Sequence, residues 1–395
     1  MSQHAFTATC APALEQILAE ELRRLGIVPN HVERSAVHFE GGLEQGYRAA
    51  LHSRVASRVL LTLRRLHVPT ANALYLGVKK MPWAEHLGPD QTLAVNFVGV
   101  SENIRNTHFG ALRVKDGVVD HFRERSGARP SIDTQAPDIQ IHVHLRDIKA
   151  TVSLDLSGYP LHLRGLDRDG GPAPLRENLA AALLQLAGWE ERAKAGEPLL
   201  DPLCGSGTFL TEAALIARGI APGLSRREWG FTRWRGHDDD LWRRLVREAQ
   251  EQIRPLGPTR LYGFDRDRDQ VTRTRNNLKR AGLTEGADVN VGQLRDAAPP
   301  FGVPPGLLIT NPPYGERLGD LDEVEQTYSL LGDVMRRRFL GWTGFVLAGS
   351  TQLAKWIGLR AARRHIIYNG PLECRLLELP ISAKPVARDG AQQRP

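Results

Sequence analysis

A short apolar run leads directly into a rigid polar turn made of Asn311, Pro312, Pro313 and Tyr314. The run, residues 306–310, has the length and composition of a buried strand. The two prolines fix φ at about −65° and supply no N–H, so the strand ends where they begin. In an open α/β sheet, ligands bind outside the carboxyl ends of the strands. This stretch therefore predicts an α/β fold with a pocket that offers an amide, a fixed carbonyl and an aromatic ring.

These groups suit a nucleobase whose exocyclic amine has to react as a nucleophile. The amine lone pair is delocalised into the ring, and acceptors that hold the two N–H groups align it with an incoming group. We expect the Asn311 side-chain oxygen and the Pro312 carbonyl to hold the amine, with Pro313 keeping the turn rigid. Tyr314 is expected to stack on the base, which is worth about 1 to 3 kcal/mol, so that Tyr314→Phe is mild. The alternative is a plain Pro-Pro turn after a strand.

Two further apolar segments end in polar groups. The segment at 198–200 runs into Asp201 and a glycine turn, in which Gly205 and Gly207 let the backbone approach a ligand where only glycine fits. This turn by itself could hold a dinucleotide. The segment at 260–264 ends in Asp265, whose carboxylate can accept both hydroxyls of a ribose.

The order of predicted elements divides the chain into modules. Residues 1–67 have the strand and helix order of a ferredoxin-like module, and 68–156 form a second small α/β module. Residues 157–173 are rich in Gly, Pro and charge and are expected to be a linker. Residues 174–382 alternate strands and helices as a doubly wound α/β domain does, and 383–395 are expected to be disordered.

Basic residues near one predicted helix start suggest contacts to phosphates. Arg105, Asn106 and Lys115 lie near the start of a helix expected over 109–125, where unpaired N–H groups also favour anions. A phosphate-binding edge and a merely solvated helix face are equally favoured by this pattern.

An insert at about 221–257 lengthens the connection between the Asp201 and Asp265 segments and interleaves cations with aromatic residues. The functional interpretation is a lip beside the pocket, with Arg233 and Arg235 contacting RNA. The structural interpretation is that the tryptophans anchor the insert, which we favour for Trp242.

Composition limits the remaining classes. The 395 residues carry a net charge of +7, which suits a nucleic-acid partner without proving one. No signal peptide or membrane span is recognisable, so we expect a cytoplasmic protein, most simply a monomer, without membrane contact. The three cysteines lie in no metal-ligand spacing. His142 and His144 fit exposed strand positions better than a metal site, because no third ligand accompanies them.

Taken in order, three motifs resemble those of class I S-adenosylmethionine-dependent RNA methyltransferases with an N-terminal THUMP domain. The motifs are 201–208, 263–267 and 311–315. Further phrases, among them 104–106, 161–165 and 369–372, resemble more narrowly the amino-terminal half of the bacterial 23S ribosomal RNA guanine-N2 methyltransferases that enterobacteria fuse to a second methyltransferase. The resemblance implies a THUMP RNA-binding domain at 68–156 and a class I methyltransferase domain at 174–382. The activity of the second methyltransferase is expected to be absent.

The resemblance also implies roles for individual residues. It assigns cofactor contacts to Asp201, Gly205, Gly207 and Asp265. We expect Cys204, Ser206, Thr208 and Arg266 in the same two motifs to contact the cofactor as well. It assigns the base-holding role to Asn311, Pro312 and Tyr314. The family usually places an aspartate after the third strand to bind the cofactor adenine, whereas this chain has Gln293 there and Asp296 further on. We favour Gln293, and we expect Arg164 in the shared phrase to contact RNA.

The leading hypothesis is methyl transfer from S-adenosylmethionine to N2 of a guanosine in 23S rRNA. Guanine-N2 methylation of tRNA and adenine-N6 methylation remain open, because each presents an exocyclic amine. A non-catalytic RNA-binding assembly protein is the rival from another class. The intact Asp201, Asp265 and Asn311 argue against that rival.

Overall fold

The computed structural model describes residues 3–166, 175–283, 285–314 and 321–382. The chain forms two compact units. The first consists of Met1–Cys10, Leu18–Gly165 and Ala221–Glu251, and the second of Ala11–Ile17, Leu166–Ile220 and Gln252–Pro395. The expected disordered tail, Gly315 and part of the expected linker lie outside the described residues.

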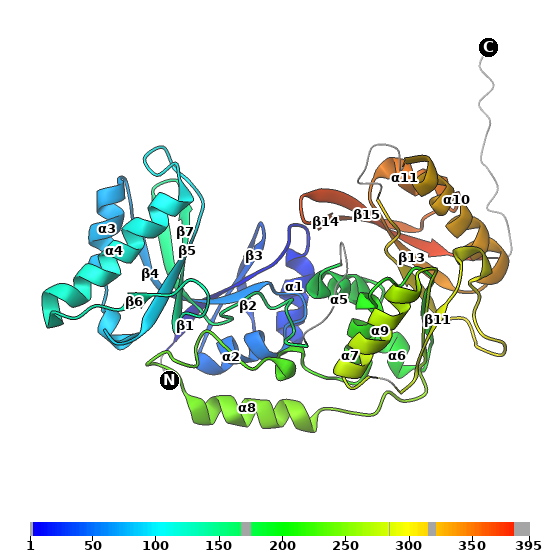
Figure 1. Cartoon of the computed structure of the whole chain (residues 1–395), viewed down its shortest axis with the longest axis horizontal. Helices are drawn as coiled ribbons and strands as arrows, with labels where there is room; N and C mark the ends of the chain where they lie inside the picture. The colour runs from blue at the N-terminus through cyan, green and yellow to red at the C-terminus, as the bar shows by residue number, and fades with distance from the viewer. Residues whose placement is uncertain (1–2, 167–174, 284, 315–320, 383–395) are drawn as a thin grey trace, which may run out of the picture. The chain divides into compact units, whose positions relative to one another are not determined.

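The first unit is built on one eight-stranded sheet with the order β2-β3-β1-β4-β8-β7-β5-β6. Its ferredoxin-like part contains β1 (His4–Thr9), α1 (Glu15–Arg24), β2 (Pro29–Glu33), β3 (Ala36–Gly41), α2 (Leu43–His52) and β4 (Arg58–His67). The following part contains α3 (Ala71–Lys79), η1 (Trp83–Glu85), β5 (Thr92–Val98), α4 (Thr107–Ser126), β6 (Ser131–Ile132), β7 (Ile139–Arg146) and β8 (Lys149–Asp155). Antiparallel pairing of β4 with β8 joins the two parts into one sheet, and α3 packs beside α4 (Figure 1).

Some features of this unit differ from the sequence expectations. The sequence patterns do not predict β2 or α3. Strand β2 forms one edge of the sheet and has no fully buried residue, so it lacks the alternation by which a strand is recognised. The expectation that His142 is exposed is wrong, because only 8% of its surface is accessible. Burial lowers the pKa of His142 to about 4, with a further contribution from Arg58, whereas His144 is exposed as expected.

Residues 221–251 of the insert belong to the first unit and carry η2 (Pro222–Ser225) and α8 (Asp239–Glu251). Their aromatic rings pack on Tyr47 of α2, whose ring centroid lies 4.6 Å from that of Phe231 and 5.7 Å from that of Trp242. Trp242 therefore anchors the insert, as predicted. Trp229 and Phe231 are buried in the same cluster, so these rings are not free to stack on bases, and the expectation of an aromatic RNA-contacting lip is wrong for them.

The second unit contains a seven-stranded sheet with the order β11-β10-β9-β12-β13-β15-β14. Its elements are α5 (Glu177–Leu186), α6 (Trp189–Lys194), β9 (Leu199–Asp201), α7 (Thr208–Ala217), β10 (Leu261–Asp265), α9 (Arg268–Arg280), β11 (Ala287–Val291), η3 (Leu294–Asp296), β12 (Leu307–Thr310), α10 (Leu321–Arg338), β13 (Thr343–Ala348), α11 (Thr351–Trp356), β14 (Arg363–Asn369) and β15 (Leu372–Pro380). The first five strands in chain order pair in parallel, and β15 lies antiparallel between β13 and β14. This is the predicted doubly wound arrangement.

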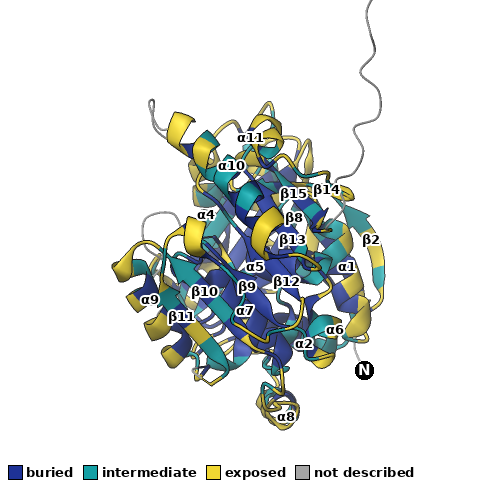
Figure 2. Cartoon of the chain, turned by 90° about the vertical axis from the view of Figure 1, so that its right-hand side faces the viewer, coloured by how far each residue is buried: buried dark blue, intermediate teal, exposed yellow. Residues whose placement is uncertain are grey.

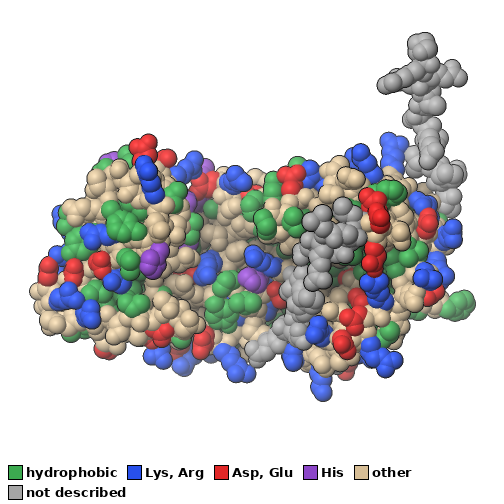
Figure 3. Space-filling view, turned by 45° about the horizontal axis from the view of Figure 1, so that its top comes forward, with side chains coloured by type: hydrophobic (Ala, Val, Ile, Leu, Met, Phe, Trp, Pro, Cys, Tyr) green, Lys and Arg blue, Asp and Glu red, His purple; other side chains and the backbone are tan. Residues whose placement is uncertain are grey.

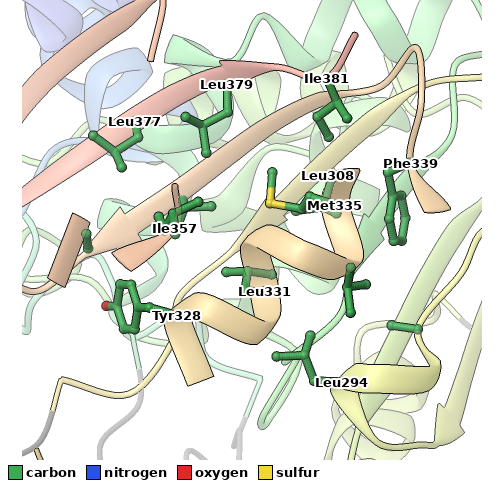
Figure 4. Packing of buried hydrophobic residues seen from close by; sticks show 14 of the residues in the cluster. Leu294, Leu308, Tyr328, Leu331, Met335, Phe339, Ile357, Leu377, Leu379 and Ile381 are labelled. Atoms are coloured by element: carbon green, nitrogen blue, oxygen red, sulfur yellow. The ribbon is translucent and has the colours of Figure 1, made fainter. Parts of the chain in front are cut away.

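The core of this sheet fixes the strands that carry the motifs. Residues of β9, β12 and α7 are buried (dark blue in Figure 2). Leu331 and Met335 of α10 belong to one cluster of buried apolar side chains with Leu308 of β12, and Met335 lies beside Leu308 (Figure 4). Helix α10 lies so close to β13 that a Cβ at Gly344 would come within 2.2 Å of the Met335 methyl carbon. This tight packing leaves the ends of the parallel strands little freedom to shift.

The described part of the chain contains no helix with the length and apolar character needed to cross a membrane. Among the same residues, no three His, Cys, Asp or Glu side chains are grouped so as to hold a metal ion. On the face shown in Figure 3, Lys and Arg side chains are interspersed with Asp and Glu rather than gathered into one basic stripe.

Candidate active site

The motifs meet at one edge of the second sheet because of its strand order. After β9 the chain moves outward through β10 and β11, and then returns to β12 on the other side of β9. Strand β12 pairs in parallel with β9, with Leu308 opposite Leu200. Asp201 is the last residue of β9 and Asn311 follows β12, so the two residues lie at the ends of neighbouring strands, on the same edge of the sheet. This point, where the strand order reverses, is where open α/β sheets bind ligands.

The glycine turn after β9 has the backbone geometry that its sequence predicts. Gly205 and Gly207 adopt φ values of +52° and +79°, which side-chain-bearing residues rarely adopt. A Cβ on Gly207 would also lie 2.5 Å from Cγ2 of Thr274 on α9. At Gly205, apart from its two chain neighbours, no atom in the described part of the chain lies within 4 Å of the position that a Cβ would take. That side of the turn therefore has open space for a ligand.

Asp265 at the end of β10 holds the glycine turn. Its Oδ2 accepts a hydrogen bond from the Gly205 N–H at 3.0 Å, and its Oδ1 accepts one from the Asp267 N–H at 2.9 Å. Each carboxylate oxygen has a further lone pair. The side chain is only half-buried, so Asp265 can accept additional hydrogen bonds from a ligand beside the turn.

Asp201 is oriented inward, with 2% of its surface accessible. Its Oδ1 accepts from the Leu203 N–H at 3.1 Å. Burial raises the pKa of Asp201 to about 7, while the Thr310 hydroxyl and the Leu203 N–H oppose the rise. Asp201 therefore supports the backbone of the glycine turn from its buried side.

The remaining residues of the turn mostly contact other parts of the protein. Asn277 donates to the Ser206 carbonyl at 2.9 Å, and the Thr208 hydroxyl donates to the Leu175 carbonyl at 3.3 Å. The Cys204 thiol is buried against Gly263 and Thr274. Burial raises the pKa of the Cys204 thiol well above its usual range. A thiol held protonated in this way is not a nucleophile.

The adenine end of the predicted cofactor site lies along β10 and β11. Asp265 aligns with Val291, and the Gly292 N–H donates to the Asp265 carbonyl at 2.9 Å. Gln293 follows directly and is exposed, as is Asp296 at the far end of η3. Arg266 forms an exposed ion pair with Glu323 of α10 at 3.3 Å. An exposed ion pair of this kind contributes little stability, so it can break, and the Arg266 side chain remains able to contact a ligand.

At the end of β12, the Tyr314 hydroxyl donates a hydrogen bond to Oδ1 of Asn311. The Asn369 side-chain N–H donates to the Tyr314 hydroxyl oxygen at 3.5 Å. Burial raises the pKa of the Tyr314 hydroxyl, so it stays protonated and can donate. Pro312 is buried and Pro313 exposed. The sequence patterns assign Asn311 and Tyr314 to one pocket but do not reveal that they bond to each other.

Several residues near this pocket were not identified from the sequence as part of it. Thr310 beside Asp201 continues an apolar strand, and Gly349 follows β13 where a Cβ would meet the Tyr314 ring at 2.6 Å. Asn369 and Cys374 belong to the β14–β15 hairpin. Asn369 begins the phrase 369–372 that supports the resemblance, which was the one available signal. Their side chains reach Tyr314 only because β15 is inserted next to β13.

The predicted RNA contacts separate into exposed and buried residues. Arg105 is exposed, Asn106 caps α4 by accepting from the Phe109 N–H at 3.0 Å, and Lys115 pairs with Asp116 at 2.8 Å. The expectation for Arg164 is wrong. It has 4% of its surface accessible, and its guanidinium donates to the carbonyls of Leu161 and Arg54, so it is committed to holding loops together.

The two arginines of the insert are exposed and attached to the first unit. Arg233 forms an ion pair with Asp138 at 3.2 Å, and its side chain is 72% exposed. Arg235 donates to the Ala84 carbonyl at 3.0 Å. A guanidinium group has five N–H donors, so both arginines can donate to a further partner while they keep these contacts.

Comparison with known proteins agrees with this architecture. The family described as RMKL-like, methyltransferase domain, matches residues 164–378, a THUMP domain matches 69–155, and an RlmL ferredoxin-like domain matches 5–60. The chain is 45% identical over 380 residues to the ribosomal RNA large subunit methyltransferase K/L of Pseudomonas paraeruginosa, covering 95% of this chain and 52% of that protein. The chain thus spans about half the length of the curated relatives it matches. The narrower expectation, that it corresponds to their amino-terminal half, is not borne out by these matches.

Two solved structures resemble the whole chain. SMU.472, named as a methyltransferase and complexed with S-adenosylhomocysteine, has a TM-score of 0.85 at 29% identity and is covered over 99% of its length by 97% of this chain. A protein from Listeria monocytogenes named as a predicted N6-adenine-specific DNA methylase has a TM-score of 0.84 at 30% identity, with 97% of it and 96% of this chain covered. The expected fold class, a class I methyltransferase domain preceded by ferredoxin-like and THUMP modules, is confirmed, and the second unit has the fold of S-adenosylmethionine-dependent methyltransferases. The chain belongs to the RMKL-like methyltransferase family.

Proposed function

We propose that this chain transfers a methyl group from S-adenosylmethionine to N2 of a guanosine in 23S rRNA. The observation that carries the proposal is the meeting of Asp265, the glycine turn and Asn311 at the point where the strand order of the second sheet reverses. The relatives named as large subunit rRNA methyltransferases support the class of substrate. A substrate of this kind also favours a cytoplasmic location.

The residues around the glycine turn fit the cofactor. Gly205 leaves open space on one side of the turn, and Asp265 offers carboxylate lone pairs next to it for ribose hydroxyls. Gln293 lies at the end of the neighbouring strand, where its amide oxygen suits the adenine amine. When bound, the cofactor supplies an electrophilic methyl group. Asp201 contributes indirectly, since its buried carboxylate supports the turn.

The residues after β12 act on the base. The Asn311 oxygen and the Pro312 carbonyl hold the exocyclic amine so that its lone pair is aligned for in-line attack. Tyr314 presents its ring to the base. The chemistry requires no covalent protein nucleophile, in agreement with the buried, protonated Cys204 thiol.

The first unit supplies the RNA contacts. The THUMP match covers Arg105, Asn106 and Lys115, and Arg233 and Arg235 present their side chains from the same unit. We propose Arg105, Lys115, Arg233 and Arg235 as phosphate contacts, because a guanidinium or ammonium group that remains exposed can neutralise a phosphate.

Adenine-N6 methylation is the second candidate function. One structural neighbour is named as an N6-adenine-specific DNA methylase, and Asn311 with Pro312 would hold either amine in the same way. Guanine-N2 methylation of tRNA would also use the same groups.

The test is incubation of the purified chain with labelled S-adenosylmethionine and, separately, ribosomal RNA and tRNA from a strain that lacks the gene. Digestion to nucleosides then identifies the product. N2-methylguanosine in 23S rRNA is the expected result. N6-methyladenosine, or label in tRNA alone, would replace the proposal with one of the alternatives. A parent protein that binds the cofactor and labels no RNA would contradict it.

A further inference from the structure

Three polar side chains form a chain of hydrogen bonds at the base pocket. The Asn369 N–H donates to the Tyr314 oxygen at 3.5 Å, and the Tyr314 hydroxyl donates to Oδ1 of Asn311. Asn369 is the last residue of β14, immediately before the tight connection to β15, in which Gly370 has φ +61°. The hairpin thereby places a donor on the tyrosine from a part of the sheet remote in sequence.

The surroundings of Tyr314 hold it in this hydrogen-bonded position. Its ring lies against Gly349, where any side chain would come within 2.6 Å of Cδ1. The Cys374 thiol also faces the Tyr314 hydroxyl, but sulfur is a weaker acceptor than an amide oxygen. The Tyr314 hydroxyl therefore donates its hydrogen bond to Oδ1 of Asn311 and not to the Cys374 sulfur.

The direction of these hydrogen bonds matters because a side-chain amide has an oxygen that accepts and an NH₂ group that donates. An asparagine can present either its oxygen or its NH₂ group to a partner, and a tyrosine hydroxyl can donate to the first or accept from the second. A donor on the other side of the hydroxyl favours the first arrangement, because the hydroxyl oxygen already accepts one hydrogen bond there and its proton is directed at Oδ1 of Asn311. Oδ1 of Asn311 still has a second lone pair for the amine of a base.

We propose that Asn369 is a positioning residue for methyl transfer. Acting through Tyr314, it fixes the amide of Asn311 so that the oxygen, and not the NH₂ group, faces the reacting amine. The inference rests on the proposed function in so far as the pocket holds an exocyclic amine, and it applies equally to guanine and adenine. It also revises the expectation that Tyr314→Phe is mild, because the hydroxyl and not only the ring has a role.

Asn369→Asp tests the direction of the hydrogen bonds and hardly changes the size of the side chain. The carboxylate has no N–H, so it can only accept a hydrogen bond from the Tyr314 hydroxyl. The tyrosine oxygen then accepts a hydrogen bond from the Asn311 NH₂ group. We expect the single-turnover methyl-transfer rate to fall about tenfold or more, which approaches the effect of removing one transition-state hydrogen bond. In the Tyr314→Phe background the link is already absent, and Asn369→Asp should change the rate less than about twofold.

The controls separate positioning from folding. Glu373→Gln alters an exposed ion pair of the same hairpin and should keep the parent rate. S-adenosylhomocysteine affinity by calorimetry and the melting temperature should match the parent in each variant. Equal rate losses from Asn369→Asp in the parent and Tyr314→Phe backgrounds would overturn the proposal.

A readout without RNA keeps this test independent of the substrate. With isotope-labelled asparagine side chains, the NMR amide signal assigned to Asn311 by its loss in Asn311→Asp should move in Asn369→Asp and stay in place in Glu373→Gln. An unmoved Asn311 signal would refute the inference whether or not the parent methylates rRNA. A moved signal with a parent that labels no RNA would refute the proposed function and leave the orientation of Asn311 established.

Discussion

The Tyr314 hydroxyl donates a hydrogen bond to Oδ1 of Asn311, so the stacking residue and the amine-holding residue form one unit. The sequence patterns assign them separate roles, the ring for stacking and the amide for holding. Because the oxygen keeps a second lone pair, this bond can orient the amide without blocking it.

Asn311→Ala should lower the single-turnover rate by about 10²-fold or more, the usual loss for a well-placed transition-state hydrogen bond. Asn311→Asp should keep more activity, because both carboxylate oxygens accept hydrogen bonds. Cofactor affinity, measured by calorimetry, should hardly change in either variant. Transfer by Asn311→Ala at the parent rate would show that the strand end is only a rigid turn.

Gly349→Ala should displace the Tyr314 ring, because the added Cβ would lie 2.6 Å from Cδ1 and 2.9 Å from Cβ of the tyrosine. We expect a loss of rate at least as large as that of Tyr314→Phe, measured in the same assay. Gly42→Ala is the matched control, since its Cβ would meet nothing closer than 3.5 Å. Equal activity of the two variants would show that Tyr314 can move freely.

Asp265→Ala should weaken S-adenosylhomocysteine binding by about 1.5 to 3 kcal/mol, the range for hydrogen bonds to a charged group. Part of the loss reflects the turn, because the Gly205 N–H loses its acceptor. Gln293→Ala should weaken binding more than Asp296→Ala, since Gln293 stands nearer the end of β11. Calorimetry that ranks Asp296 above Gln293 would assign the adenine contact to Asp296 instead.

Asp201 should make stability fall as the pH rises. Its folded-state pKa of about 7 lies above the ordinary 3.8, so between these values the unfolded chain releases a proton that the folded chain keeps. The free energy of unfolding therefore decreases from about pH 4 to about pH 7, by at most about 4 kcal/mol, and this contribution is constant above pH 7.

Asp201→Asn removes this titration. Urea unfolding of the cofactor-free protein should show the variant gaining stability relative to the parent across that window. The exposed Asp288→Asn serves as the control. A constant difference between Asp201→Asn and the parent from pH 4 to pH 8 would contradict the assignment.

Arg105→Ala and Lys115→Ala should each reduce the slope of log affinity for RNA against log salt by about 1, because each removes one phosphate contact. Arg164→Ala should act differently. Its buried guanidinium donates to the Leu161 and Arg54 carbonyls, so the variant should lose stability in urea unfolding before any change in salt slope appears. A folded Arg164→Ala with a reduced slope would restore Arg164 as an RNA contact.

The structure also changes how the catalytic part should be isolated. A fragment that starts at about residue 157 keeps residues 221–251, which pack in the first unit. Such a fragment would expose Trp229, Phe231 and Trp242, which otherwise bury one another against Tyr47. The modules therefore cannot be separated by one cut in the linker.

Local patterns in the sequence determine the elements and the ends of the strands. The glycines of the turn, Asp265 and the Asn-Pro-Pro-Tyr stretch each require a backbone conformation or a chemical group that few other residues supply, so their positions are readable without a structure. Hydrophobic periodicity likewise predicts most helices and strands of both units. It does not predict β2, since an edge strand without a buried face leaves no such pattern.

Only the tertiary structure decides which side chains meet. Asn369 reaches Tyr314 because β15 lies antiparallel between β13 and β14. Arg164 and His142 are both buried, and Arg164 donates to the Arg54 carbonyl, which lies 110 positions away in the chain. The insert joins the first unit through contacts between residues about 190 positions apart, such as Tyr47 and His237. Such contacts form because the whole fold buries these side chains, and no local sequence pattern indicates them. The sequence therefore shows which groups belong to the site, and the fold determines which groups they contact.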